Sequence, residues 1–76
     1  MNEFIAYLVK NLVDKPELVK IEAMEVDQEI VLEVSVSPED VAKVIGRQGR
    51  TIQSLRTIAI SVGARLGKKI KLEVVN

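Results

Sequence analysis

Two glycines three positions apart constrain the fold of this chain more than any other feature. Gly46 and Gly49 bracket Arg47 and Gln48, an apolar pair precedes them, and a run with apolar residues at helical spacing follows. This pattern predicts one helix that ends, a tight turn, and a second helix that begins. Because glycine lacks a Cβ, the main chain at both positions can take a positive φ and approach a bulky group closely.

The same stretch has the chemistry of an anion site. The first N–H groups of the second helix are expected to be free donors at the positive end of its dipole. Lys43, Arg47 and Arg50 add positive charge around the turn. The spacing alone also fits a simpler alternative, in which Gly46 is only a helix C-cap and Gly49 a turn residue. The flanking pattern decides between the two.

Charge is divided unevenly along the chain, although the net charge is zero. Residues 1–40 hold three basic residues against ten acidic ones, and residues 41–76 hold eight basic residues against Glu73 alone. This asymmetry favours an anionic partner for the C-terminal half. The alternative is that the two halves neutralise each other across the fold.

Composition excludes several functions. Without cysteine or histidine, the chain has no disulfide framework, no thiolate or imidazole metal site and no histidine base. Carboxylates are plentiful, but none is paired with a nucleophile, so we expect no enzyme, metal or cofactor. Phe4 and Tyr7 are the only aromatic residues, which makes base stacking improbable. We find no signal peptide or membrane span and expect a soluble cytoplasmic protein.

The apolar spacing before the turn predicts a helix, a hairpin and a short helix. The first helix begins at an Asn2 cap, carries Phe4 beside its apolar face and ends at Asp14-Lys15-Pro16. Strands over 18–26 and 29–36 alternate in polarity and join at Asp27-Gln28. Ser37 is the predicted hydroxyl cap of the short helix, which Gly46 ends.

After the turn, the pattern predicts a long helix and a last strand. The helix runs from about Gly49 to Leu66, with Gly67 as its stop, and the strand covers 68–75. We expect Gly63 to allow close packing. The predicted core stripe of the helix consists of Ile52, Leu55, Ala59, Val62 and Leu66.

Two isoleucines lie off this stripe, on opposite margins of the long helix. Ile58 has small polar neighbours, whereas Ile60 lies on the side of Arg56, nearer the basic turn. Either could be an ordinary exposed apolar residue. Association is plausible because a domain of 76 residues is close to the size at which one core is marginal. We favour the first margin for it, through Ile58, Ser61 and Arg65, because the Arg56 side lies nearer the basic turn.

This order, with the stretch over 44–52 between the second and third helices, resembles the type II K-homology (KH) RNA-binding domain. The runs Gly49-Arg50-Thr51-Ile52 and Leu55-Arg56-Thr57-Ile58, and the chain length, look like the small bacterial single-domain KhpA proteins. The resemblance implies an α+β fold of order α-β-β-α-α-β, with a three-stranded sheet packed by three helices. It also implies that residues 1–76 form a single KH domain.

In such domains, the GXXG loop clamps the backbone of about four unpaired nucleotides, and the bases lie in an apolar groove. The resemblance therefore implies groove candidates at Val44, Ile45 and Ile52, with Val34 or Val36 as wall residues, although each is also a credible core residue. The RNA-binding residues that it implies are Lys43, Ile45, Gly46, Arg47, Gln48, Gly49, Arg50 and Ile52.

The same resemblance implies a role as an RNA chaperone or post-transcriptional regulator. Relatives form homodimers, pair with a larger KhpB protein that carries its own KH domain, and are linked to cell envelope, shape and division. An alternative is a dimerisation or adaptor module that acts through a KhpB-like partner with little direct RNA binding. Single-stranded DNA is a weaker candidate ligand.

Overall fold

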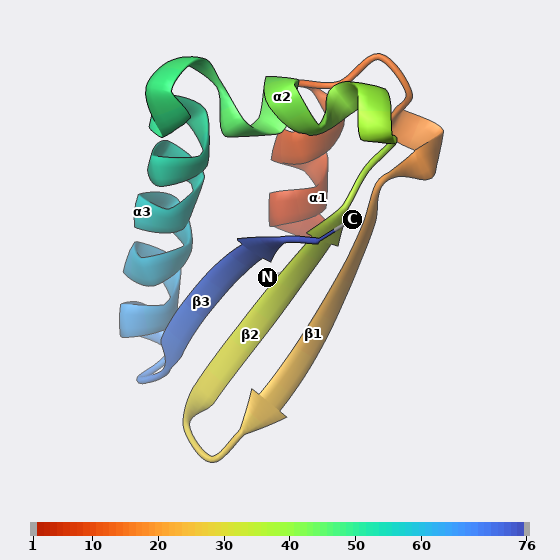
Figure 1. The fold of residues 1–76 in the computed structure, drawn as a ribbon. Coiled ribbons are helices and arrows are strands. Elements are labelled where there is room, and N and C mark those ends of the chain that lie inside the picture. The colour runs from red at the N-terminus through yellow and green to blue at the C-terminus, as the bar shows by residue number, and fades with distance from the viewer. Residues whose placement is uncertain (1, 76) are drawn as a thin grey trace.

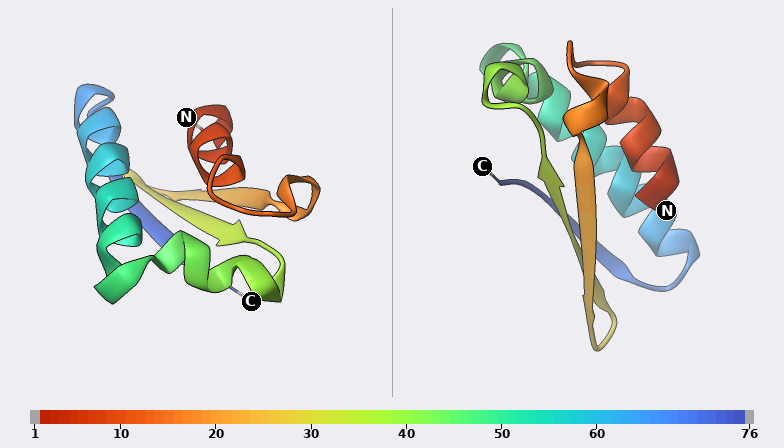
Figure 2. Two further views of the ribbon diagram at one scale, coloured as in Figure 1. Left: turned by 90° about the horizontal axis from the view of Figure 1, so that it is seen from above. Right: turned by 90° about the vertical axis from the view of Figure 1, so that its right-hand side faces the viewer.

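A computed structural model describes residues 2–75, and the side chains of residues 3–75. Its α+β fold confirms the predicted order, with helices α1 and α3 on one face of a three-stranded sheet and the short α2 across one end of it (Figures 1 and 2). Single 3-10 turns, η1 to η3, occur at Pro16–Leu18, Pro38–Asp40 and Arg47–Gly49. The main elements are α1 (Asn2–Lys10), β1 (Lys20–Val26), β2 (Glu29–Ser35), α2 (Val41–Ile45), α3 (Arg50–Arg65) and β3 (Lys69–Val74).

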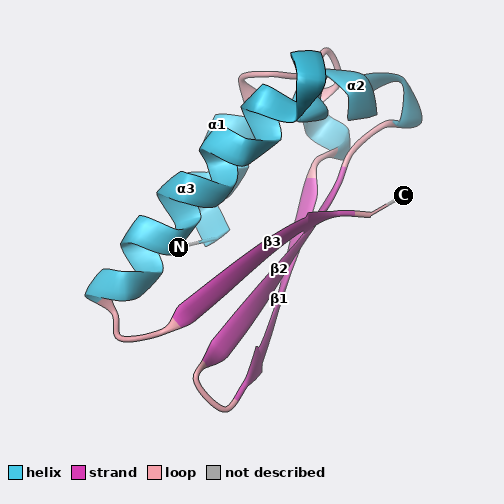
Figure 3. Ribbon diagram, turned by 60° about the vertical axis from the view of Figure 1, so that its left-hand side comes forward, coloured by secondary structure: helices cyan, strands magenta, loops and turns pink. Residues whose placement is uncertain are grey.

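The sheet has the order β1-β2-β3, with β1 antiparallel and β3 parallel to β2. The predicted hairpin is confirmed: Val26 pairs with Glu29, and Asp27 in the two-residue turn takes a φ of 56°. A parallel pair needs a crossover connection, and here α2 and α3 supply it (Figure 3). The glycine turn therefore joins the two helices of the crossover, and β3 forms one edge of the sheet.

The core is built by the alternating residues of β2 and β3 and by Ile52, Leu55 and Ala59 of α3, as the sequence predicts. Val62, also predicted in the stripe of α3, is only partly buried. Burial of these side chains is the main favourable contribution to folding. Gly63 lies where α3 approaches β3, and a Cβ there would come within 2.3 Å of Ile70 Cγ1, which confirms the predicted close packing. The buried apolar residues are Ile5, Val9, Leu32, Val34, Val36, Val44, Ile52, Leu55, Ala59, Ile70 and Leu72.

The first helix is shorter than predicted. It ends at Lys10 rather than near Asp14, because the Asn11 side-chain amide donates to the Tyr7 carbonyl at 2.7 Å and the backbone tightens there. Leu12, predicted on the buried face, is exposed, and Phe4 is half-exposed. The predicted cap at Asn2 lies outside the described side chains.

The first strand begins two residues later than predicted. Pro16 starts a 3-10 turn that takes up Leu18, with the Val19 amide donating to the Pro16 carbonyl. The far half of β1 projects beyond the helices (Figure 1), so Ala23 is exposed although the alternation placed it on the core face.

Two predictions about the helix ends were wrong. Ser37 is buried but makes no side-chain cap bond at the start of η2. Leu66 is exposed, because α3 ends at Arg65 and the chain turns away there. The stop at Gly67 is confirmed by its φ of 71°.

Candidate nucleic-acid interface

The turn between α2 and α3 requires its glycines. Gly46 has a φ of 77° and a ψ of 175°, a conformation that is essentially restricted to glycine. A Cβ on Gly46 would lie 2.1 Å from the Thr51 hydroxyl oxygen. Gly49 has a φ of 74° and no heavy atom within 4 Å of an added Cβ, so it is constrained by its backbone alone. The turn is therefore more than a helix C-cap followed by a filler residue.

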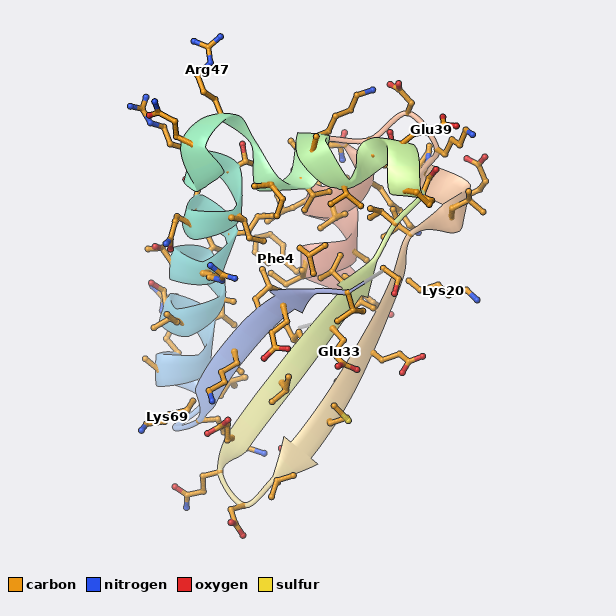
Figure 4. The ribbon with its side chains drawn as sticks, in the orientation of Figure 1. Phe4, Lys20, Glu33, Glu39, Arg47 and Lys69 are labelled. Atoms are coloured by element: carbon orange, nitrogen blue, oxygen red, sulfur yellow. The ribbon has the colours of Figure 1, made fainter. Side chains whose placement is uncertain are left out.

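The tip of the turn presents polar side chains to solvent. Arg47 and Gln48 are exposed, and Arg47 points away from the body of the molecule (Figure 4). Gln48 takes a φ of 56°, and its side-chain oxygen accepts a bond from Arg50 Nη2 at 3.3 Å. Two guanidinium groups and an amide therefore surround one small turn.

The start of α3 is less open than the sequence suggests. The N–H of Arg50, expected to be free, donates to the Arg47 carbonyl, and the N–H of Gly49 donates to the Gly46 carbonyl at 3.1 Å. Glycine at the N-cap nevertheless leaves the helix start uncovered by any capping side chain. The positive end of the α3 dipole therefore faces the same surface as Arg47 and Arg50.

In the folded chain, several lysines of the basic half pair with carboxylates of the acidic half, whereas among the described residues the arginines do not. Lys43, Lys68 and Lys71 of the basic half pair with Asp14, Glu25 and Glu29 of the acidic half. Within residues 3–75, no carboxylate oxygen lies within 4.0 Å of an arginine side-chain nitrogen. Neutralisation across the fold thus accounts for several lysines, and the four arginines keep uncompensated charge.

Lys43, unlike the arginines of the turn, is paired with carboxylates of its own chain. Its ammonium bonds the Asp14 carboxylate and lies 3.8 Å from Asp40. The hydrogen bond with Asp14 raises the pKa of Lys43 above its ordinary value, as expected for an ammonium beside a carboxylate. Lys43 is therefore held by two carboxylates of its own chain.

The apolar groove candidates lie mostly in the core. Val44, Val34, Val36 and Ile52 are buried. Ile45, the last residue of α2, is the one candidate of this group with a partly exposed side chain. The buried members hold α2 and α3 against the sheet and set the position of the turn.

A groove that the sequence did not indicate runs between α3 and the free edge of β3. One hollow of about 340 Å³ is lined by Arg56, Ile60 and residues 70–73. The Arg56 Nε donates to the Leu72 carbonyl at 3.1 Å and forms one wall. In the sequence, the only indication of this groove was the position of Ile60 off the predicted core stripe. The strand edge that lies next to Ile60 depends on the order of the strands in the sheet.

Backbone groups of β3 also face this groove. In a parallel ladder, alternate residues bond the neighbouring strand, and the Lys69 and Val75 amides donate to the Gln28 and Val34 carbonyls. The N–H and C=O groups of Ile70, Leu72 and Val74 consequently point away from β2, where the sheet has no further strand. The groove thus combines apolar lining with main-chain donors and acceptors.

The opposite margin of α3 carries the predicted self-association residues. Ile58, Ser61 and Arg65 are all exposed. Ile60 and Arg56 lie on the other side of the helix, along β3. The helix therefore presents two separate surfaces, one beside the groove and one facing away from β3.

The order α-β-β-α-α-β, the mixed sheet and the glycine turn between α2 and α3 together define a KH domain of type II. Comparison with known proteins then places the chain within that class: the family model described as "KhpA/KhpB, KH domain" matches residues 2–74. The chain belongs to the KhpA/KhpB KH-domain family, as its sequence predicts.

Relatives match along nearly their whole length. The RNA-binding protein KhpA of Chlamydia pneumoniae is 45% identical over 74 residues, covering 97% of this chain and 95% of the relative. The protein of the same name in Listeria monocytogenes is 45% identical over 75 residues, covering 99% of both chains. In Clostridium perfringens the figures are 40% identity, 99% of this chain and 100% of the relative.

Family membership confirms that the chain is a binding domain and not an enzyme. Among the described residues, no helix is long and apolar enough to cross a bilayer.

Proposed function

We propose that this protein binds single-stranded RNA, with the Gly46–Gly49 turn holding the sugar-phosphate backbone. The turn itself carries this proposal: its glycines permit close approach, and Arg47 and Arg50 face solvent without a carboxylate partner among residues 3–75. Arginine suits phosphate because its planar guanidinium donates in a fixed fork. The relatives named RNA-binding protein KhpA support the same ligand.

The bases then extend from the turn into the groove between α3 and β3. Arg56 lies six residues after Arg50, which is about 9 Å along a helix. Ile60 offers an apolar surface to a base, and the outward N–H and C=O groups of β3 can bond a base edge. Recognition through unpaired base edges favours single strands over duplex RNA.

A double substitution, Arg47→Asp with Gln48→Asp, tests the role of the turn. Two carboxylates at the tip would repel phosphates, so we expect RNA binding to be lost. Asp tolerates the left-handed φ of residue 48 better than most residues, so the fold should persist. The measurement is fluorescence anisotropy with a short single-stranded RNA, alongside circular dichroism.

Lys20→Asp with Gln28→Asp is the matched control, because it changes the net charge equally at exposed sites on β1 and its hairpin. This variant should bind RNA nearly as well as the parent chain. Normal binding by a well-folded Arg47→Asp/Gln48→Asp variant would show that the turn is not the RNA site.

We also propose that the whole chain acts as one KH domain, as a homodimer, through Ile58, Ser61 and Arg65 on α3. One groove reads few bases, and two linked grooves raise the effective concentration of the second binding event. In this proposal the protein works in the cytoplasm as an RNA chaperone or post-transcriptional regulator. Its dimerisation surface also allows a heteromer with a larger KhpB-like KH protein.

The adaptor alternative uses that same exposed surface. Ile58 remains 36% exposed on the side of α3 facing away from β3. If partner binding alone were the function, substitution of Ile58 would abolish activity and substitutions in the turn would have no effect.

A further inference from the structure

Asp40 is a buried carboxylate outside the proposed RNA surface. It is 1% exposed, and its two oxygens accept the backbone N–H groups of Asp14 at 3.2 Å and Lys15 at 3.0 Å. These amides belong to the connection between α1 and β1, which lies beside the start of α2 (Figure 1). Asp40 therefore joins two segments that are 25 and 26 positions apart in the sequence.

The helix α2, which follows Asp40, is too short to be stable without contacts to the rest of the fold. The helix α2 has 5 residues, whereas isolated helices shorter than about 12 residues are marginal in water. Its last residue, Ile45, leads directly into Gly46, so the direction of α2 sets the position of the turn. Buried Val44 anchors one side of α2, and Asp40 anchors its beginning.

Lys43 completes this attachment. It lies one turn after Asp40 on α2, and its ammonium bonds Asp14, whose own N–H donates to Asp40. The side chain thus links α2 to the same connection that Asp40 holds. The ammonium is therefore already engaged by carboxylates of its own chain.

We propose that Asp40 is a positioning residue for the Gly46–Gly49 turn and that Lys43 belongs to this attachment, not to the phosphate contacts. The proposal rests on the proposed RNA-binding function for its effect on affinity. Asp40 keeps α2 docked before RNA arrives. If the docked fraction falls, the apparent dissociation constant rises by the same factor, while the phosphate contacts in the complex are unchanged.

The test compares Asp40→Asn with Glu39→Gln. Both remove one negative charge next to the start of α2, but Glu39 is exposed and pairs with Lys15 at 3.3 Å. A purely electrostatic effect would strengthen RNA binding in both variants. Asparagine cannot accept both N–H groups in this geometry, so we expect Asp40→Asn to weaken binding about tenfold or more, the scale of one charge-assisted hydrogen bond. We expect no weakening for Glu39→Gln.

The salt dependence separates positioning from phosphate contact. Each lost phosphate contact lowers the slope of log K against log salt by about 0.7 for single strands. Asp40→Asn and Lys43→Gln should both leave that slope unchanged. A slope lowered by about 0.7 in Lys43→Gln would place its ammonium on a phosphate and overturn this part of the proposal.

Hydrogen exchange in the unmodified protein provides a test that needs no variant. Because coupling between two sites is reciprocal, added RNA should slow exchange of the Asp14 and Lys15 amides. The Val19 amide, which bonds the Pro16 carbonyl at 3.1 Å in the same segment, is the internal control. Unchanged exchange at Asp14 and Lys15 under saturating RNA would refute the coupling.

Failure of the RNA-binding proposal would look different. The parent chain would then bind no RNA, yet Asp40→Asn should still shift the amide resonances of residues 46–49 and speed exchange at Asp14 and Lys15. If Asp40→Asn left both unchanged, Asp40 would not position the turn.

Discussion

At the residue scale, the two glycines of the turn have different roles. Gly46 adopts a backbone conformation essentially restricted to glycine and lies against Thr51, whereas Gly49 adopts a left-handed helical conformation with open space around it. In the GXXG sequence pattern, the two glycines look equivalent. The structure shows that the first is limited by backbone and packing and the second by backbone alone.

Alanine substitutions should therefore have unequal effects. We expect Gly49→Ala to lower the free energy of unfolding by about 1–2 kcal/mol, the cost of a left-handed residue with a Cβ. Gly46→Ala should cost a further 1–3 kcal/mol or so from overpacking against Thr51. Urea denaturation followed by circular dichroism measures both. Equal losses would mean that the close contact with Thr51 is relieved at little cost.

At the element scale, α3 has two exposed margins with the core stripe between them. Its length, its start after Gly49 and its stop at Gly67 were predictable from spacing. The exposure of Leu66 was not, because it depends on where the last turn of the helix meets β3. The surroundings of the two margins differ: the edge strand β3 lies beside Ile60, and Ile58 faces the other way.

A pair of aspartate substitutions tests whether the Ile58 margin and the Ile60 margin of α3 have different roles. We expect Ile58→Asp to split the proposed homodimer and Ile60→Asp to keep the dimer but weaken RNA binding, since a charge would enter the groove. Both side chains are already partly exposed, at 36% and 57%, so the fold should tolerate either change. Analytical ultracentrifugation and RNA titration distinguish them. The reverse pattern would assign dimerisation to the Ile60 margin.

At the scale of the whole molecule, folding pairs part of the positive charge and leaves part of it unpaired among the described residues. The acidic half neutralises three lysines of the basic half, whereas no arginine is paired with a carboxylate among residues 3–75. The composition could not make this distinction, because it depends on which strands and loops become neighbours.

RNA affinity should accordingly depend strongly on salt. About four phosphate contacts at roughly −0.7 each give a slope near −3 for log K against log salt. A titration with a short single-stranded RNA at several salt concentrations measures it. A slope near zero would indicate binding without phosphate contacts and would contradict the proposed role of the turn.

The sequence by itself determined the elements and their connection. Periodicity and turn residues act over a few positions, so the hairpin at Asp27, the alternation in β2 and β3, and the glycine turn were predictable from local physics. The boundaries of α1 and β1 were wrong by a few residues, where the Asn11 side chain and the Pro16 turn compete with the longer pattern.

Only the tertiary structure decided which distant residues meet around α2 and β3. Asp40 carries no long-range signal in the sequence, but it accepts two amides from a segment 25 and 26 positions away. Lys43 looked like a free cation, and folding pairs it with Asp14. The groove beside Ile60 exists because β3 forms a sheet edge. Such contacts depend on chain segments meeting in space, which residue spacing along one segment does not encode.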